Sequence, residues 1–185
     1  MRKIEGGDTS NPAKPLCDVL RVKFDGCGGE VTNFGKSIKI NDFNHYRSRG
    51  HDGQFSPGTK DRALSLMTAA SYDALRLALP TSNVRNGDLG ENVILGGPTS
   101  DDLQVGRRLR LGPTCVVEIT QANTPCFRLN NVSWAAAAKK KWGDERVRWF
   151  KNDVCPLSRY GGRGWLCKVL TEGDVRKNDV VTFCD

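Results

Sequence analysis

The sequence predicts a mainly β fold, a β-rich α+β domain with about two peripheral helices. Short segments that alternate apolar and polar residues recur along the chain, as half-buried strands do. The clearest are 18–24, 107–112 and 115–120. Helical periodicity is confined to 68–79 and 133–142. Many short strands with few helices favour a barrel-like β domain.

The first strands are predicted near the start of the chain. "DVLRVKF" places Leu20, Val22 and Phe24 on one face, and "SIKI" at 37–40 has the same alternation. The stretch 41–60 is rich in Gly, Asp, Ser and His, which predicts a long loop. Long loops in compact domains are often functional.

A strand followed by a helix is predicted next. "RALSLM" at 62–67 is a short strand, and "TAASYDALRLAL" is a helix with Thr68 as N-cap and Pro80 as its stop. The buried stripe of this helix is expected to be Tyr72, Leu75 and Leu79.

The second half of the chain closes the domain. A Gly-Pro turn at 112–113 joins "RRLRLG" to "CVVEIT", and "SWAAAAKKKW" is a helix. Trp134, Ala138 and Trp142 share one face of that helix, typical of a packing stripe. "GWLCKVL" and "DVVTFC" are the last predicted strands.

Length and composition indicate one soluble domain. The chain has 185 residues, of which 38% are hydrophobic and 26% charged. We expect residues 1–15 to be a flexible arm and 16–185 a single domain. No apolar run is long enough for a secretory signal or a membrane span, so a cytoplasmic protein without membrane contact is expected.

The charge is uneven. The net charge is +7, and residues 134–163 hold eight Lys and Arg but three Asp and Glu. This predicts a basic face or a solvated helix surface. No recognised module accompanies it, so nucleic-acid binding is not expected.

The seven cysteines do not form a metal or disulfide framework. There is no CxxC, and the chain has two histidines. Most of these thiols are expected to be small buried hydrophobes.

Three segments carry more polar chemistry than their turns require. "NGDLGENVILGG" has a tight turn at Asn86-Gly87 and places Asp88, Glu91 and Asn92 before a strand. It does not open a helix, so it is not a dinucleotide phosphate loop. "RYGGRGWLCKVL" puts Arg163 at a strand start, where its guanidinium could hold a phosphate. An ordinary loop-to-strand junction is the alternative.

The third segment, "TPCFRLN", places Cys126 directly after Pro125. Proline cannot donate to a sheet ladder, so the chain is expected to leave the sheet there. A thiol beside Arg128 could have a lowered pKa and act as a thiolate nucleophile or metal ligand. Locally, a buried structural thiol is the other interpretation.

The order of these segments resembles the MOSC family, the domain that forms the C-terminal part of molybdenum-cofactor sulfurases and also occurs alone. The resemblance spans Asp61 to Val181, about two-thirds of the chain. Four segments carry it: "DRALSLMTAASYDALR", "NGDLGENVILGG", "LQVGRRLRLGPTCVVEITQANTPCFRLN" and "GGRGWLCKVLTEGDVRKNDVV". Gly-Glu-Asn followed by Pro-Cys-Phe-x-Leu-Asn is typical of the small stand-alone members.

The resemblance implies a MOSC-type β-barrel, similar to the pyruvate-kinase-type barrel. It also implies binding of the molybdenum cofactor, Mo-molybdopterin, a pterin whose dithiolene sulfurs hold molybdenum and whose tail ends in phosphate. The family's cysteine falls on Cys126, as the molybdenum ligand or a sulfur carrier. Members related to the amidoxime-reducing enzymes reduce N-hydroxylated substrates to amines, which implies an oxidoreductase.

On this hypothesis Cys126 ligates molybdenum and Glu91 donates a proton. The small members' histidine segment corresponds loosely to "RGHDGQFSPGTKDRA", which gives His51 a minor role. The candidate cofactor-binding residues are Asp88, Asn92, Arg128, Asn130, Arg163 and His51. Asn92 and Asn130 are expected near the pterin or the metal, and the two arginines as an anion clamp.

The alternative is a sulfur or cofactor carrier in cofactor maturation, with Cys126 holding a persulfide. A disused ancestral site is a third interpretation. The chain has no pyridoxal-phosphate desulfurase domain and no electron-supplying domain. A reductase therefore needs an electron-donor protein besides its small-molecule substrate, and a carrier needs a sulfur-donor protein, for which 134–163 is the candidate surface.

Overall fold

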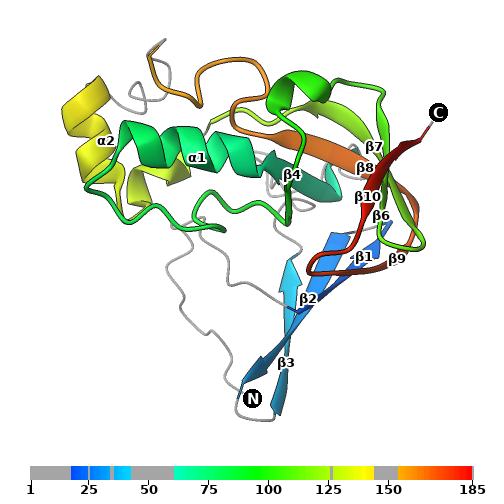
Figure 1. The fold of residues 1–185 in the computed structure, drawn as a ribbon. Helices are drawn as coiled ribbons and strands as arrows, with labels where there is room; N and C mark the ends of the chain where they lie inside the picture. Colours follow the sequence, from blue (N-terminus) through cyan, green and yellow to red (C-terminus); the bar gives the residue numbers. More distant parts are fainter. Residues whose placement is uncertain are drawn as a thin grey trace, which may run out of the picture.

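The computed structural model is mostly strand, with two α-helices gathered on one side (Figure 1). It describes residues 18–24, 26–33, 36–42, 61–125, 127–143 and 154–184. The predicted mainly β fold is confirmed. The expected arm at 1–15 and all but the start of the expected loop at 41–60 lie outside the described residues.

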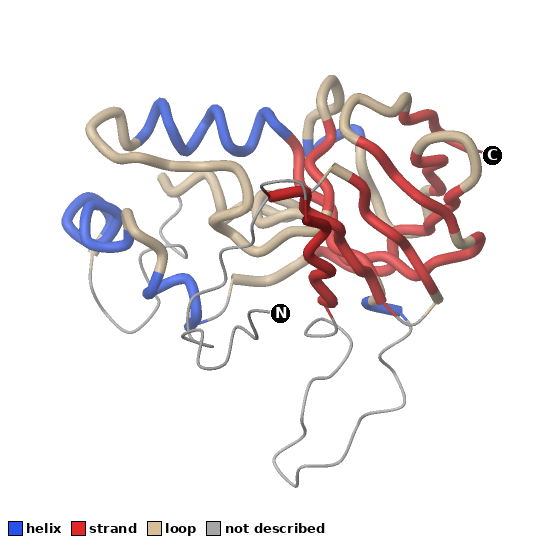
Figure 2. The backbone as a smooth tube through the Cα atoms, turned by 90° about the horizontal axis from the view of Figure 1, so that it is seen from below, coloured by secondary structure: helices blue, strands red, loops and turns tan. Residues whose placement is uncertain are grey.

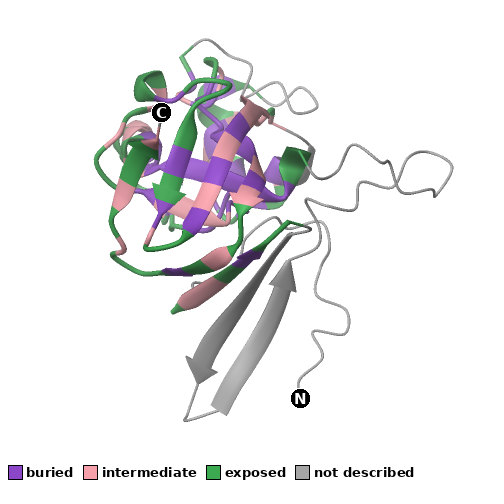
Figure 3. Cartoon of the chain, turned by 90° about the vertical axis from the view of Figure 1, so that its right-hand side faces the viewer, coloured by how far each residue is buried: buried purple, intermediate pink, exposed green. Residues whose placement is uncertain are grey.

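A six-stranded sheet forms the main body, in the order β10-β6-β7-β8-β4-β5. Its strands are β10 (Val181–Cys184), β6 (Arg108–Leu111), β7 (Cys115–Ala122), β8 (Trp165–Thr171), β4 (Leu64–Thr68) and β5 (Val93–Leu95). Neighbours are antiparallel except β4 and β5, which are parallel. Register shifts interrupt the β7–β8 pairing, and such bulges bend a sheet. The sheet accordingly curls, with buried stretches along its strands (Figure 3).

A second sheet has four antiparallel strands in the order β3-β2-β1-β9. These are β3 (Lys36–Asp42), β2 (Gly26–Asn33), β1 (Val19–Lys23) and β9 (Gly173–Arg176). Val22 of β1 and Val175 of β9 join the apolar core of the six-stranded sheet. Phe24, predicted to share a face with Leu20 and Val22, is 49% exposed and lies one residue beyond the end of β1.

Both helices pack around a second apolar core. Helix α1 (Ala69–Ala78) begins at the predicted N-cap, where Oγ1 of Thr68 accepts from the N–H of Ser71 at 3.2 Å. The predicted stripes of α1 and of α2 (Ala135–Trp142) are buried and meet in this core. Lys141 on α2 also donates to the carbonyl of Ala78 at 2.6 Å. In Figure 2 the two helices lie together, away from most strands.

Element boundaries follow the sequence closely except at two places. Strands β2 and β9 were not predicted, because their glycines interrupt the apolar alternation. Strand β7 ends at Ala122, so the chain leaves the sheet before Pro125 rather than at it.

Candidate functional site

Three of the polar segments predicted from sequence meet at one end of the curled sheet. They are the loop at 85–92 before β5, the exit of β7 at 123–125, and the entry of β8 at 161–164. The N–H of Asn123 donates to the carbonyl of Gly164 at 2.8 Å, which joins exit to entry. The guanidinium of Arg163 donates through Nη2 to the carbonyl of Leu89, which joins entry to loop.

Glu91 lies at the centre of a buried network in this loop. It is 5% exposed, and its Oε1 accepts from the Tyr72 hydroxyl at 2.7 Å and from the N–H of Gly87 at 2.8 Å. The Tyr72 oxygen in turn accepts from the N–H of Gly87 at 3.1 Å and of Leu89 at 3.2 Å. Helix α1 therefore holds this part of the loop through the Tyr72 hydroxyl.

The surroundings of Tyr72 determine which partner donates in its hydrogen bond with Glu91. Burial, and then the negative charge of Glu91, raise the pKa of Tyr72 far above its usual range, while the charge of Arg163 acts in the opposite sense. Tyr72 thus keeps its proton and donates it to Oε1 of Glu91. Oε2 of Glu91 is buried and has no hydrogen-bond partner among the described residues.

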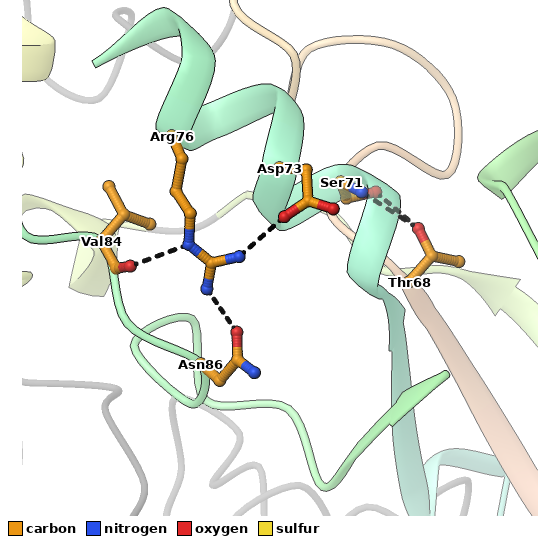
Figure 4. Close-up of polar contacts among 6 residues, drawn as sticks. All are labelled: Thr68, Ser71, Asp73, Arg76, Val84 and Asn86. Carbon is orange, nitrogen blue, oxygen red and sulfur yellow. Dashed lines mark hydrogen bonds and ion pairs between the residues drawn. The ribbon is translucent and has the colours of Figure 1, made fainter. Parts of the chain in front are cut away.

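Arg76 fixes the start of the loop from the next turn of α1 (Figure 4). Its Nε donates to the carbonyl of Val84 at 3.2 Å, and its Nη2 donates to Oδ1 of Asn86 at 2.5 Å. Asp73 holds the same guanidinium at 2.9 Å. The Asn86-Gly87 turn is therefore anchored as well as tight.

Asp88 braces the loop against the segment that follows Cys126. Its Oδ2 accepts from the indole N–H of Trp134 at 3.0 Å and from the N–H of Arg85 at 2.8 Å. Trp134 is the N-cap residue of α2 and is 2% exposed. The carboxylate predicted to bind cofactor thus ties the loop to the second helix.

Asn92 closes the loop onto the sheet. Its Oδ1 accepts from both the N–H and the hydroxyl of Ser65, at 2.9 and 2.8 Å, and its own N–H donates to the Ser65 hydroxyl at 3.0 Å. These bonds stand at the start of the parallel β4–β5 pair. The observed work of Asn92 is to hold the loop in place.

Glycines let the Arg163 segment approach its neighbours closely. Gly164 has φ of +90°, and a Cβ there would collide with the carbonyl oxygen of Leu66. Three residues earlier, the carbonyl of Gly161 accepts a hydrogen bond from the hydroxyl of Ser100 at 3.2 Å. Arg163 is thereby held at 6% exposure rather than at the surface.

The remaining predicted residues are placed less fully. Cys126 and His51 lie outside the described residues. Arg128 and Asn130 belong to a 3-10 helix, η3 (Phe127–Asn131), between the β7 exit and Trp134, and Asn130 is half-buried. The chain before Cys126 is tied to the β8 entry through Asn123, and the chain after it is tied to the loop at 85–92 through Trp134.

The other described cysteines fit the structural interpretation. Cys115, Cys155 and Cys167 are buried, and Cys184 is half-buried. Burial raises the pKa of Cys115 to about 11, and the pKa of Cys155 also to about 11. Such thiols stay protonated and unreactive at neutral pH.

The described part of the chain contains neither a cluster of metal ligands nor a membrane-spanning helix. No group of three or more His, Cys, Asp or Glu side chains there could hold a metal. None of the helices described has both the length and the apolar character needed to cross a membrane.

Sequence analysis missed Tyr72, Arg76, Ser65 and Trp134 as residues of the site. Tyr72 and Trp134 were predicted only as core residues, because they follow the apolar spacing of a helix. That spacing does not show that the Tyr72 hydroxyl and the Trp134 indole N–H also make hydrogen bonds. Their partners lie 19 and 46 residues away in the chain. No local pattern reports such pairs.

Comparison with known proteins gives a family match. The family model described as "MOSC domain" matches residues 33–182. A protein of Gibberella moniliformis called "Reductase" is 25% identical over 196 residues, which cover 96% of this chain and 31% of that protein. YflK of Bacillus subtilis, called "Uncharacterized protein", is 27% identical over 176 residues, 94% of this chain and 61% of YflK. The chain thus spans less than two thirds of both relatives.

Solved structures show the same fold. The YUAD protein from Bacillus subtilis has a TM-score of 0.58 at 17% identity, over 95% of this chain and 89% of that one. YiiM from Escherichia coli has a TM-score of 0.53 at 18% identity, over 92% of this chain and 64% of that one.

Proposed function

Since the chain belongs to the MOSC domain family, we propose that it binds the molybdenum cofactor and reduces N-hydroxylated compounds. The observation that supports this proposal is the meeting of three polar segments, the loop at 85–92, the β7 exit at 123–125 and the β8 entry at 161–164. The Gibberella moniliformis relative called "Reductase" supports the choice of reaction. An electron-donor protein supplies the electrons in this proposal.

The described residues fit such a cofactor in polarity. A pterin with a phosphate tail needs hydrogen-bond acceptors for its N–H groups and positive charge for its phosphate. The loop provides a buried carboxylate oxygen on Glu91, and the β8 entry provides the buried guanidinium of Arg163. The second oxygen of Glu91 has no hydrogen-bond partner among the described residues, and a buried polar atom left unpaired needs a physical reason.

Each candidate residue has a role in the proposal. The thiolate of Cys126 ligates molybdenum, because a soft sulfur ligand suits a sulfur-rich centre. Arg128 and Arg163 bind the phosphate, and Asn130 lies near the pterin. Asp88 and Asn92 act on the cofactor indirectly by holding the loop at 85–92. His51 has a minor contact from the predicted loop at 41–60.

The reaction is a two-electron reduction. When bound, the cofactor supplies the two electrons that break the N–O bond, and two protons complete an amine and water. The protein's own task is to enclose and orient the cofactor. Tyr72, Trp134 and Ser65 do this by fixing the loop from α1, α2 and β4.

The test starts with protein made in a host that synthesises the molybdenum cofactor. Molybdenum and pterin per chain are measured in the wild type, in Cys126→Ser, and in Cys184→Ser as a matched control on β10. We expect wild type and control to contain both, and Cys126→Ser to lose molybdenum. Wild-type protein without molybdenum or pterin refutes the proposal.

Turnover separates reductase from carrier. With a chemical reductant, an N-hydroxylated purine or an amidoxime should be converted to the amine by the wild type and not by Cys126→Ser. Retained turnover in Cys126→Ser excludes the thiolate from the mechanism. Cofactor binding without turnover favours the sulfur or cofactor carrier instead.

A further inference from the structure

The Glu91 carboxylate presents its two oxygens differently. Oε1 accepts from Tyr72 at 2.7 Å and from Gly87 at 2.8 Å. Among the described residues, Oε2 is the one carboxylate oxygen that is buried without a hydrogen-bond partner. Buried polar atoms are nearly always paired, and the exceptions need a physical reason.

The loop around Glu91 is too well anchored for Oε2 to be a packing accident. Tyr72, Gly87 and Leu89 share one set of hydrogen bonds around the hydroxyl oxygen and Oε1. Arg76 and Asp88 fix the same loop from outside. This bracing holds the carboxylate in one orientation and directs all its internal donors to Oε1.

We propose that Oε2 of Glu91 accepts an N–H hydrogen bond from the amino-pyrimidinone edge of the bound pterin. This role rests on the cofactor-binding function proposed above. The pterin edge carries an amino group beside a ring N–H, so its donors can meet a single acceptor. Charge-assisted bonds of this type are the strong ones in proteins.

A resident cofactor suits this atom better than a substrate does. Glu91 is 5% exposed and other protein atoms cover Oε2, so the pterin edge reaches this oxygen only when those atoms move aside. A substrate must enter and leave at each turnover, whereas a cofactor can stay enclosed between turnovers. The buried position of Oε2 therefore suits a cofactor that stays bound better than a substrate that exchanges at each turnover.

In this proposal Glu91 accepts a hydrogen bond from the cofactor, whereas the sequence predicted that Glu91 donates a proton. Both bonds in which Glu91 takes part run toward the carboxylate, from an O–H and from an N–H. Glu91 also acts on Tyr72 as a negative charge. Acceptance at Oε2 continues that pattern on the second oxygen.

Glu91→Gln tests the polarity of this one atom. The amide oxygen can keep the bonds from Tyr72 and Gly87, so the amide NH2 then replaces Oε2 and faces the pterin as a donor. We expect pterin to dissociate about 10- to 100-fold faster from this variant, the range for one hydrogen bond to a charged group. Pterin fluorescence after dilution measures the loss, and thermal unfolding verifies the fold.

Glu118→Gln is the matched control. Glu118 lies on β7, where its carboxylate pairs with Arg108 at 3.0 Å and with Lys168 at 2.6 Å. The chemical change is the same, but it falls on the sheet surface outside the loop. Pterin release from this control should equal that of the wild type.

The ligand side supplies an independent measurement. At one ring position pterin carries an amino group, whereas lumazine carries a carbonyl oxygen. Wild-type apoprotein should bind pterin more tightly than lumazine in a fluorescence titration. Glu91→Gln should shift that preference toward lumazine, because its amide N–H can donate to the carbonyl.

The outcomes separate the two proposals. Equal pterin retention in Glu91→Gln and wild type overturns the role of Oε2 and leaves cofactor binding intact. Wild-type protein that carries no pterin overturns cofactor binding, and the Oε2 role with it. If Glu91→Gln does not fold, equal affinity of the wild type for pterin and lumazine overturns the role.

Discussion

Tyr72→Phe should destabilise the protein far more than the loss of one hydroxyl on a surface would. The hydroxyl makes three hydrogen bonds, to Glu91 at 2.7 Å, Gly87 at 3.1 Å and Leu89 at 3.2 Å. Without it, Gly87 still donates to Glu91, but the N–H of Leu89 loses this acceptor and Glu91 loses a charge-assisted bond. A bond to a charged group contributes about 1.5 to 3 kcal/mol, and an unpaired buried donor costs about 1 to 3 kcal/mol. We expect the free energy of unfolding to fall by about 2.5 to 6 kcal/mol.

Urea unfolding followed by fluorescence of the four tryptophans measures this change. Tyr160→Phe is the matched control, because Tyr160 is 71% exposed and its ring meets the Trp165 ring edge-on, a contact that does not involve the hydroxyl. The control should change the unfolding free energy by less than about 0.5 kcal/mol. A loss below about 1 kcal/mol in Tyr72→Phe would refute the view that α1 holds the loop through this hydroxyl.

Three further predictions concern stability. Gly164→Ala should prevent normal folding, because φ of +90° disfavours alanine and its Cβ would meet the carbonyl of Leu66; a thermal melt like that of the wild type contradicts this. Ser65→Ala should cost about 1 to 2 kcal/mol in urea unfolding, since two hydroxyl bonds to Asn92 are lost while its backbone bonds remain. Burial raises the pKa of Cys115 from about 9 to about 11, so its contribution to stability is full below pH 9 and is lost as the pH rises through 11. In Cys115→Ala the unfolding free energy should fall less over that interval, by about 2 to 3 kcal/mol, and an unchanged difference between the two proteins would contradict the shift.

The elements with a strong local pattern could be predicted from sequence. Thr68 marks the start of α1 because its hydroxyl is a good cap, and the stripe ending at Leu79 is buried because its spacing follows the helix. Strand β2 could not be predicted, since three of its eight residues are glycines. Its place depends on pairing with β1 and β3, which no local window contains.

The candidate site was predictable in its parts and not in its connections. The loop at 85–92 was singled out because it holds more polar groups than a turn needs. The sequence did not predict the hydrogen bonds between Asp88 and Trp134 or between Glu91 and Tyr72. Helical periodicity treats an aromatic residue as apolar, even when its hydroxyl or indole N–H makes a hydrogen bond. The structure shows hydrogen bonds from Tyr72 to Glu91 and from Trp134 to Asp88, while the predicted roles of the two carboxylates stay predictions.

The spacing of the loop's contacts along the chain also bears on how the protein is made. The loop's hydrogen bonds join residues that lie 19, 27, 46 and 74 positions apart in the sequence. Such distant contacts form slowly, since much chain must be ordered before they close. The last of them waits until the ribosome has synthesised the β8 entry, so the loop should reach its final arrangement only after nearly the whole domain has been translated.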